Sequence, residues 1–202
     1  MRSKIKISII LNILIVVFEL LSLFIAFKNN GISMFMYYTE LSNILALLSS
    51  SIYLIYIFTN KKINLFISSF KFLSTLCLLI TFLVVIFILI PLTGLNSFAE
   101  YFKHAMFFHH LICPLLSYIT FIYFDDIVIN KKYPKLVVSW TLLYGIILTV
   151  LNILKKVDGP YPFLRVYEQP IYMSFIWSIL IIGFSYVLST MLMRKILNKN
   201  YQ

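Results

Sequence analysis

Histidine is the side chain best suited to proton transfer near neutral pH and a common metal ligand. The chain has three, and His104, His109 and His110 all fall in one apolar stretch. Because they would share one helix, they cannot clamp a haem between two helices of a single chain. A metal site would need Cys113 or acids from other helices, and the sequence shows no metal-ligand spacing. The pattern therefore predicts no metal and no cofactor.

The adjacent histidines cannot both face the same groove, since neighbouring residues on a helix point ~100° apart. His110 would share its face with Pro114 and Ser117, and His109 with Cys113 and Thr120. Periodicity does not choose between the two. One of them could simply hydrogen-bond within the interior of a helix bundle.

The composition indicates that these residues are held by a membrane protein. Of the 202 residues, 61% are hydrophobic and 12% are charged, whereas ordinary soluble domains have ~45–50% and ~25%. The mean hydropathy is +0.96. The net charge of +10 comes from short clusters between apolar runs, which is the pattern of orientation signals in membrane proteins and not of a nucleic-acid-binding face. Cys77 and Cys113 fall inside apolar runs and are interpreted as small apolar filler.

Six apolar runs are long enough to cross the ~30 Å hydrocarbon core as helices. Each is continuously apolar and not alternating, which favours helices over strands. The sequence thus predicts an all-α, polytopic bundle forming a single domain over residues 1–202. The predicted helices are Ile7–Phe27, Met36–Phe58, Phe72–Pro91, His104–Phe124, Leu136–Leu154 and Ile171–Met193.

The loop charges predict the orientation of this bundle. One side carries twelve cations: Arg2, Lys4, Lys6, Lys61, Lys62, Lys71, Lys131, Lys132, Lys135, Arg194, Lys195 and Lys199. The other side carries five: Lys28, Lys103, Lys155, Lys156 and Arg165. The positive-inside rule then puts both termini in the cytoplasm of a multi-pass plasma-membrane protein. The first apolar run is too long for a signal-peptide core and is predicted to be retained as a helix.

Polar residues within the predicted spans gather near their outer ends. With a rise of ~1.5 Å per residue, Thr39 lies about 5 Å below the outer end, the His109–His110 pair about 8–9 Å and Glu19 about 12 Å. The same half also holds Glu40, Asn43, His104, Asn152 and Glu168, while the inner half has no acid or histidine. Because polar groups within a span are costly, this clustering predicts a pocket open to the outer leaflet.

The second predicted span also carries small and polar residues along one face, at Thr39, Asn43, Ala46, Ser50 and Tyr53. Close helix packing accounts for the serines, whereas Thr39 and Asn43 lie at the depth of the histidines.

A further feature is the stretch from Asp158 to Leu164, where two prolines and a glycine indicate a rigid turn. Its Tyr161 could dip into the membrane interface. The turn is either a lid over the outer pocket or a plain connector.

Two short motifs resemble a known family. Tyr38-Thr39-Glu40-Leu41-Ser42-Asn43 opens one span and His109-His110-Leu111-Ile112-Cys113-Pro114 opens another. Together with a Tyr-Pro-Phe-Leu turn before the last span, they are similar to the androgen-induced and androgen-dependent TFPI-regulating membrane proteins and their bacterial relatives. The resemblance implies that a threonine and a histidine in the membrane hydrolyse fatty acid esters of hydroxy fatty acids.

Carried over by motif, the catalytic threonine is Thr39 and the histidine is His109 or His110. The chain departs from the animal pattern in having Glu40 after the threonine and a doubled histidine. The chemistry is reasonable, since an imidazole can take the proton that makes a threonine hydroxyl nucleophilic. Asn43 would hold the histidine or an oxyanion.

The two acids near this pair have several open interpretations. Glu19 or Glu40 would orient the imidazole, or pair with Lys28, or remain solvated at the interface. Asn152 and Tyr161 are further candidates for lining the substrate pocket. The expected function is a hydrolase of lipid-like esters. The alternatives are a non-catalytic carrier or binder of lipids or small molecules, and an accessory membrane subunit; neither the oligomeric state nor the substrate follows from the sequence.

Overall fold

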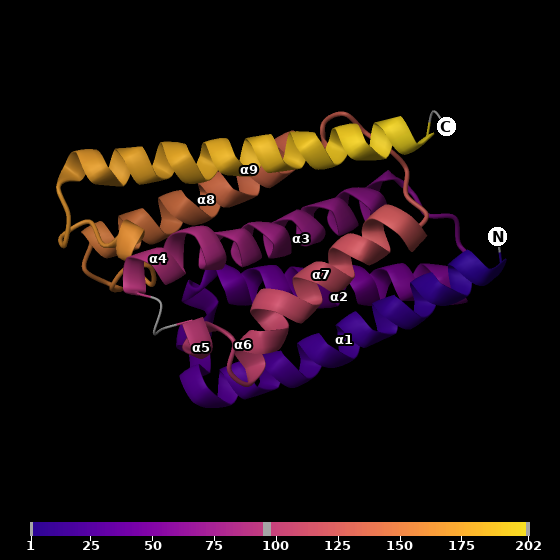
Figure 1. Cartoon of the computed structure of the whole chain (residues 1–202), viewed down its shortest axis with the longest axis horizontal. Coiled ribbons are helices and arrows are strands. Elements are labelled where there is room, and N and C mark those ends of the chain that lie inside the picture. The colour runs from indigo at the N-terminus through magenta and orange to yellow at the C-terminus, as the bar shows by residue number, and fades with distance from the viewer. Residues whose placement is uncertain (1, 95–97, 201–202) are drawn as a thin grey trace. The chain divides into compact units, whose positions relative to one another are not determined.

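A computed structural model describes residues 2–94 and 98–200 (Figure 1). The chain is 83% helical, and the described residues contain no strand. Six helices are long and apolar enough to cross a membrane, which confirms the all-α, six-span prediction. They cover Ser3–Met36, Tyr38–Phe58, Leu65–Thr93, Ala105–Phe124, Tyr133–Ile153 and Ile171–Asn198. The cytoplasmic location of the termini stays a prediction.

The chain divides into two compact units, Met1–Asn130 and Lys131–Gln202, and each is described by itself. The first unit contains four main helices, α1 (Arg2–Asn30), α2 (Tyr38–Phe58), α3 (Leu65–Val84) and α7 (Cys113–Ile119). Helix α1 packs against α2 and α7, and α3 packs against the same two neighbours (Figure 1). Shorter elements connect them: η1 (Gly31–Met36), α4 (Ile90–Thr93), α5 (Phe98–Tyr101) and α6 (Ala105–Phe107).

The centre of this unit is formed by one small or apolar residue from each main helix. Ile15, Ala46, Leu78 and Cys113 are all at most 1% exposed and form a common cluster. The predicted small and polar face of α2 is buried along its length, because Thr39, Asn43, Ala46, Ser50 and Tyr53 are each at most 6% exposed. Cys77 and Cys113 are buried free thiols.

Two spans of this unit widen where a proline interrupts the hydrogen-bond ladder. The π-helical turn η2 (Val85–Leu89) stands just before Pro91, and η4 (Phe108–Ile112) stands just before Pro114. A proline lacks the N–H that would bond the carbonyl four residues earlier, and its ring clashes with that carbonyl, so the preceding turn opens. For Pro114 this carbonyl belongs to His110. Both histidines of the adjacent pair therefore lie on a wide turn, a feature frequent at functional sites.

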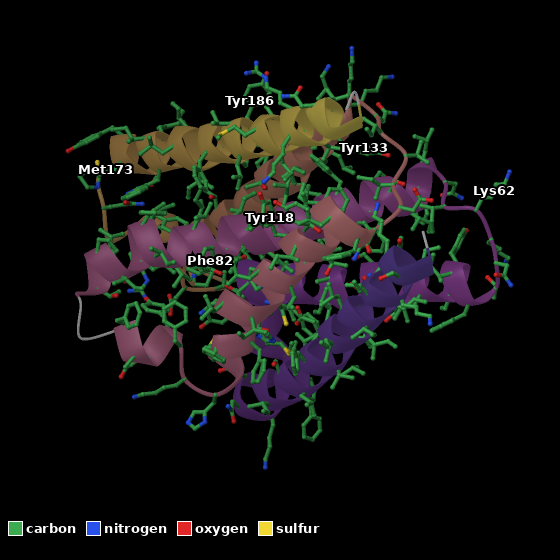
Figure 2. All side chains as sticks on the ribbon, turned by 45° about the vertical axis from the view of Figure 1, so that its right-hand side comes forward. Lys62, Phe82, Tyr118, Tyr133, Met173 and Tyr186 are labelled. Carbon is green, nitrogen blue, oxygen red and sulfur yellow. The ribbon has the colours of Figure 1, made fainter. Side chains whose placement is uncertain are left out.

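The start of α3 corrects the predicted third span. We predicted that this span begins at Phe72, with Lys71 among the loop cations, but α3 begins at Leu65. The Asn64 side chain accepts a hydrogen bond from the Ile67 N–H at 3.0 Å and caps the helix seven residues earlier. Lys62 remains in the turn and points away from the helices (Figure 2). Lys71, in contrast, is inside the span and fully buried.

The second unit consists of α8 (Tyr133–Ile153), the short η6 (Pro162–Leu164) and α9 (Ile171–Asn200). Helices α8 and α9 pack along each other, and many side chains of α9 are exposed, including Tyr186 (Figure 2). The turn from Asp158 to Leu164 is compact. A Cβ atom on Gly159 would lie 2.7 Å from the carbonyl carbon and oxygen of Leu164, so only glycine fits there.

Candidate functional site

His109 lies between two carboxylates that come from different helices. Its Nδ1 is 3.2 Å from Glu40 Oε2, in the first turn of α2, and its Nε2 is 3.7 Å from Glu19 Oε2, in the middle of α1. All three side chains are at most 3% exposed. Both acids thus lie beside a histidine, and that histidine is His109. The expectation that one of these acids orients the catalytic imidazole stays a prediction.

These close approaches do not complete hydrogen bonds. Among the described residues, both ring nitrogens of His109, both oxygens of Glu19 and Oε2 of Glu40 have no partner with hydrogen-bond geometry. A buried polar group without a hydrogen bond is costly and in native proteins calls for an explanation. The three side chains thus lie against one another without hydrogen bonds between them.

His110 has a different environment from its neighbour. Its Nδ1 is 2.8 Å from the backbone carbonyl oxygen of Tyr101, and the rings of Tyr101 and Phe102 pack around it at 6.2 and 6.5 Å. A carbonyl only accepts, so Nδ1 of a neutral imidazole must carry the hydrogen here. Nε2 is then the nitrogen with the free lone pair, which is the atom that a general base uses.

Thr39 and Asn43 both lie in the buried first turns of α2. Thr39 directly precedes Glu40, the residue that contacts His109, and is 6% exposed. Asn43 donates its side-chain N–H to the Thr39 carbonyl oxygen at 2.8 Å, so this amide braces the backbone of the threonine. Its Oδ1 is buried and has no hydrogen-bond partner among the described residues.

Two predicted pocket residues belong to the second unit, where both stabilise the connecting loop. The Asn152 side chain donates to the Val157 carbonyl and accepts from the Val166 N–H, both at 2.9 Å. Tyr161 stacks on Phe163 with ring centroids 5.2 Å apart. Asn152 thus holds both ends of the turn between α8 and α9.

The sequence analysis missed a second buried cluster. Lys71 Nζ lies 3.3 Å from Asp125 Oδ2, and both side chains are completely buried. Lys71 also donates to Asn12 Oδ1 at 2.7 Å and to Ser50 Oγ at 3.2 Å. Asp125 Oδ1 in turn accepts from Ser8 at 2.7 Å and from Asn12 at 2.9 Å. This network joins α1, α2, α3 and the end of the span that contains α7.

The sequence contains local signals for some residues of this cluster. Asn64 is a good N-cap residue and would have moved the start of the helix ahead of Lys71. Ser8 and Asn12 are four apart, so they share one face of α1. The local pattern does not reveal the partner of Lys71, since Asp125 is 54 positions away and is brought to it only by helix packing.

In the ranges that the structure describes, no three histidine, cysteine, aspartate or glutamate side chains are arranged to hold a metal ion. The site consists of two neighbouring histidines with unlike surroundings, two carboxylates on one of them, and a threonine adjacent to one carboxylate. Comparison with protein-family models, with curated proteins and with solved structures gives no match to this chain.

Proposed function

We propose that this protein is a membrane-embedded hydrolase of lipid-like esters, with Thr39 as the nucleophile and His110 as the general base. The observation that carries the proposal is the bond between His110 Nδ1 and the Tyr101 carbonyl, which leaves Nε2 as the proton acceptor in a buried site. The resemblance of the two motifs to a family of membrane threonine hydrolases supports Thr39 and one of the two adjacent histidines, without choosing between them.

In this mechanism His110 Nε2 takes the hydroxyl proton of Thr39 while the hydroxyl oxygen of Thr39 attacks the ester carbonyl carbon. The ester C–O bond breaks, the alcohol leaves with the proton from His110, and the acyl group stays on Thr39 as an ester. Water then attacks that ester with His110 again as the base, which releases the fatty acid and restores the hydroxyl.

The neighbouring acids have a supporting role. A transient imidazolium at His110 is stabilised by nearby negative charge, as the acid of a Ser-His-Asp triad stabilises its histidine. Glu40 contacts His109, the residue next to His110 in the chain, and would supply this charge when it is ionised. The ester bonds of lipids lie at the headgroup boundary, near the depth predicted for Thr39 and the histidines.

The test uses purified protein in lipid vesicles with a fluorogenic long-chain ester. Thr39→Val keeps the shape and removes the hydroxyl, Thr39→Ser keeps a hydroxyl, and His110→Ala removes the base. We expect Thr39→Val and His110→Ala to lower turnover by about 10²–10⁴-fold, and Thr39→Ser to retain part of it. Thr120→Val is the matched control, because Thr120 is fully buried and donates only to its own helix at Leu116 O.

Unchanged turnover in Thr39→Val, His110→Ala and His109→Ala would refute this mechanism. A chain that binds the ester without converting it would instead be a lipid-binding or carrier protein. A stoichiometric second protein that copurifies with an inactive chain would indicate an accessory subunit.

A further inference from the structure

The first unit contains two buried ionisable clusters that differ in charge balance. Lys71 and Asp125 are one cation and one anion in direct contact, and four hydrogen bonds join them to Ser8, Asn12 and Ser50. Asp125 Oδ2 faces Lys71 and has no hydrogen-bond partner of its own among the described residues. The cluster of Glu19, Glu40 and His109 has two acids and a single base. In the described part of the chain, neither glutamate has a lysine or arginine within ion-pair distance.

The cluster of Glu19, Glu40 and His109 also has fewer hydrogen-bond donors than acceptors. Two further buried atoms have no hydrogen-bond partner among the described residues: Asn43 Oδ1, which only accepts, and Ser22 Oγ, whose hydroxyl can donate or accept. Both side chains are at most 1% exposed. Ser22 is three residues after Glu19 and Asn43 is three after Glu40, so each lies on the helix face that carries the carboxylate. The buried carboxylate oxygens of Glu19 and Glu40 and the amide oxygen of Asn43 therefore all need hydrogen-bond donors.

Other titratable groups around the cluster do not supply the missing positive charge. The cluster itself consists of Glu19 on α1, Glu40 on α2 and His109 on η4. The titratable groups next to it are His110 on η4 and Cys113 on α7. On α3, Cys77 accepts a hydrogen bond from Tyr38. A thiol cannot carry a positive charge, so Cys77 does not supply one either. With both carboxylates ionised and a neutral imidazole, the cluster would carry two uncompensated negative charges in a fully buried place, which proteins avoid by taking up protons.

We propose that Glu19, Glu40 and His109 form a buried proton-binding site that holds two exchangeable protons at neutral pH. Either both glutamates are carboxylic acids beside a neutral imidazole, or one is an acid and the other a carboxylate that pairs with an imidazolium. Both arrangements are electrically neutral, and both leave at least one glutamate protonated. The two protons also provide hydrogen-bond donors for the buried atoms of Glu19, Glu40 and His109 that have no partner among the described residues.

This inference does not depend on the hydrolase proposal, because it concerns the charge state of the resting protein. Its ligand is the proton, and the site would take protons from or return them to water when a neighbouring charge changes. The other occupant that such oxygens accept is a small metal cation, and the experiment separates the two.

The experiment is solid-state NMR of the full chain in lipid bilayers with carboxyl-¹³C-labelled glutamate. The chain has only four glutamates, Glu19, Glu40, Glu100 and Glu168, and the last two are exposed. We expect the signals of Glu100 and Glu168 in the ionised position at neutral pH, and at least one buried signal in the protonated position. Glu19→Gln and Glu40→Gln assign the buried signals, and Asp158→Asn is the control, because it removes an exposed acid and leaves all four glutamates in place.

Four ionised glutamate signals at neutral pH would overturn the proposal. So would ionised signals of Glu19 and Glu40 that shift when sodium replaces a bulky organic cation, since this result assigns the site to a metal cation. If either glutamine variant fails to fold, the wild-type spectrum alone still decides, because the number of protonated glutamates is read without any substitution.

Discussion

The buried pair of Lys71 and Asp125 gives the sharpest stability prediction. Replacing Lys71 with methionine keeps an unbranched side chain that is one atom shorter and removes its charge, which leaves Asp125 buried without its counter-ion. At 3.3 Å and an effective dielectric constant of about 20, the Coulomb attraction is roughly 5 kcal/mol. Because removal of one partner of a buried pair typically costs ~3–5 kcal/mol, we expect Lys71→Met to lower the free energy of unfolding by about that amount.

A double-mutant cycle isolates this pair from its surroundings. Asp125→Leu alone should cost a similar amount, whereas the double variant Lys71→Met/Asp125→Leu should cost much less than the sum, since no unpaired charge remains. The assay is reversible unfolding of the protein in mixed detergent micelles, followed by circular dichroism. Lys62→Met is the matched control, because Lys62 is an exposed lysine of the preceding turn, and should change stability by less than ~0.5 kcal/mol.

Two results would contradict this reasoning. In the first, Lys71→Met would be as mild as Lys62→Met, so that the ion pair would contribute nothing to folding. In the second, the cost of the double variant would equal the sum of the single costs. The two residues would then act independently despite their contact.

Three further predictions concern other parts of the chain. Gly159→Ala should destabilise the second unit by about 1–3 kcal/mol, because the new Cβ would overlap the backbone of Leu164; an unchanged melting temperature would contradict this. Asn152→Ala removes two hydrogen bonds to the loop backbone, worth roughly 1 kcal/mol each, and should speed amide exchange at Val166, whereas exchange within α9 should stay as it is. Pro114→Ala restores an N–H that can close the wide turn, so it should lower ester turnover without lowering thermal stability; full activity would show that the wide turn is not needed.

The spans could be predicted from the sequence because their signal is local. Each run is apolar over the thickness of a bilayer, and its type follows without knowledge of any neighbour. The beginning of α3 differs from the prediction for a local reason as well, since Lys71 resembles a loop cation although the Asn64 cap starts the helix before it. A buried lysine is exceptional and becomes visible only with its partner, Asp125, which is distant in sequence.

The helical rise predicts that Thr39, Glu19, Glu40 and the histidines lie at similar levels along their helices, and Glu19 and Glu40 do lie against His109. Their depth in a membrane stays a prediction, and their lateral arrangement could not be predicted. The two histidines could not be distinguished, because their environments are set by the backbone of a different segment. Only folding brings the Tyr101 carbonyl to His110 and places both acids against His109.

The catalytic claim is tested most directly by finding where an acyl group is held. The protein in vesicles is treated with a slowly hydrolysed long-chain activated ester, quenched in acid and digested, and the peptides are analysed by mass spectrometry. The proposal predicts an acyl adduct on Thr39 that is absent from Thr39→Val and strongly reduced in His110→Ala. Turnover of the ester without any adduct on Thr39, or an adduct on another residue, would contradict it.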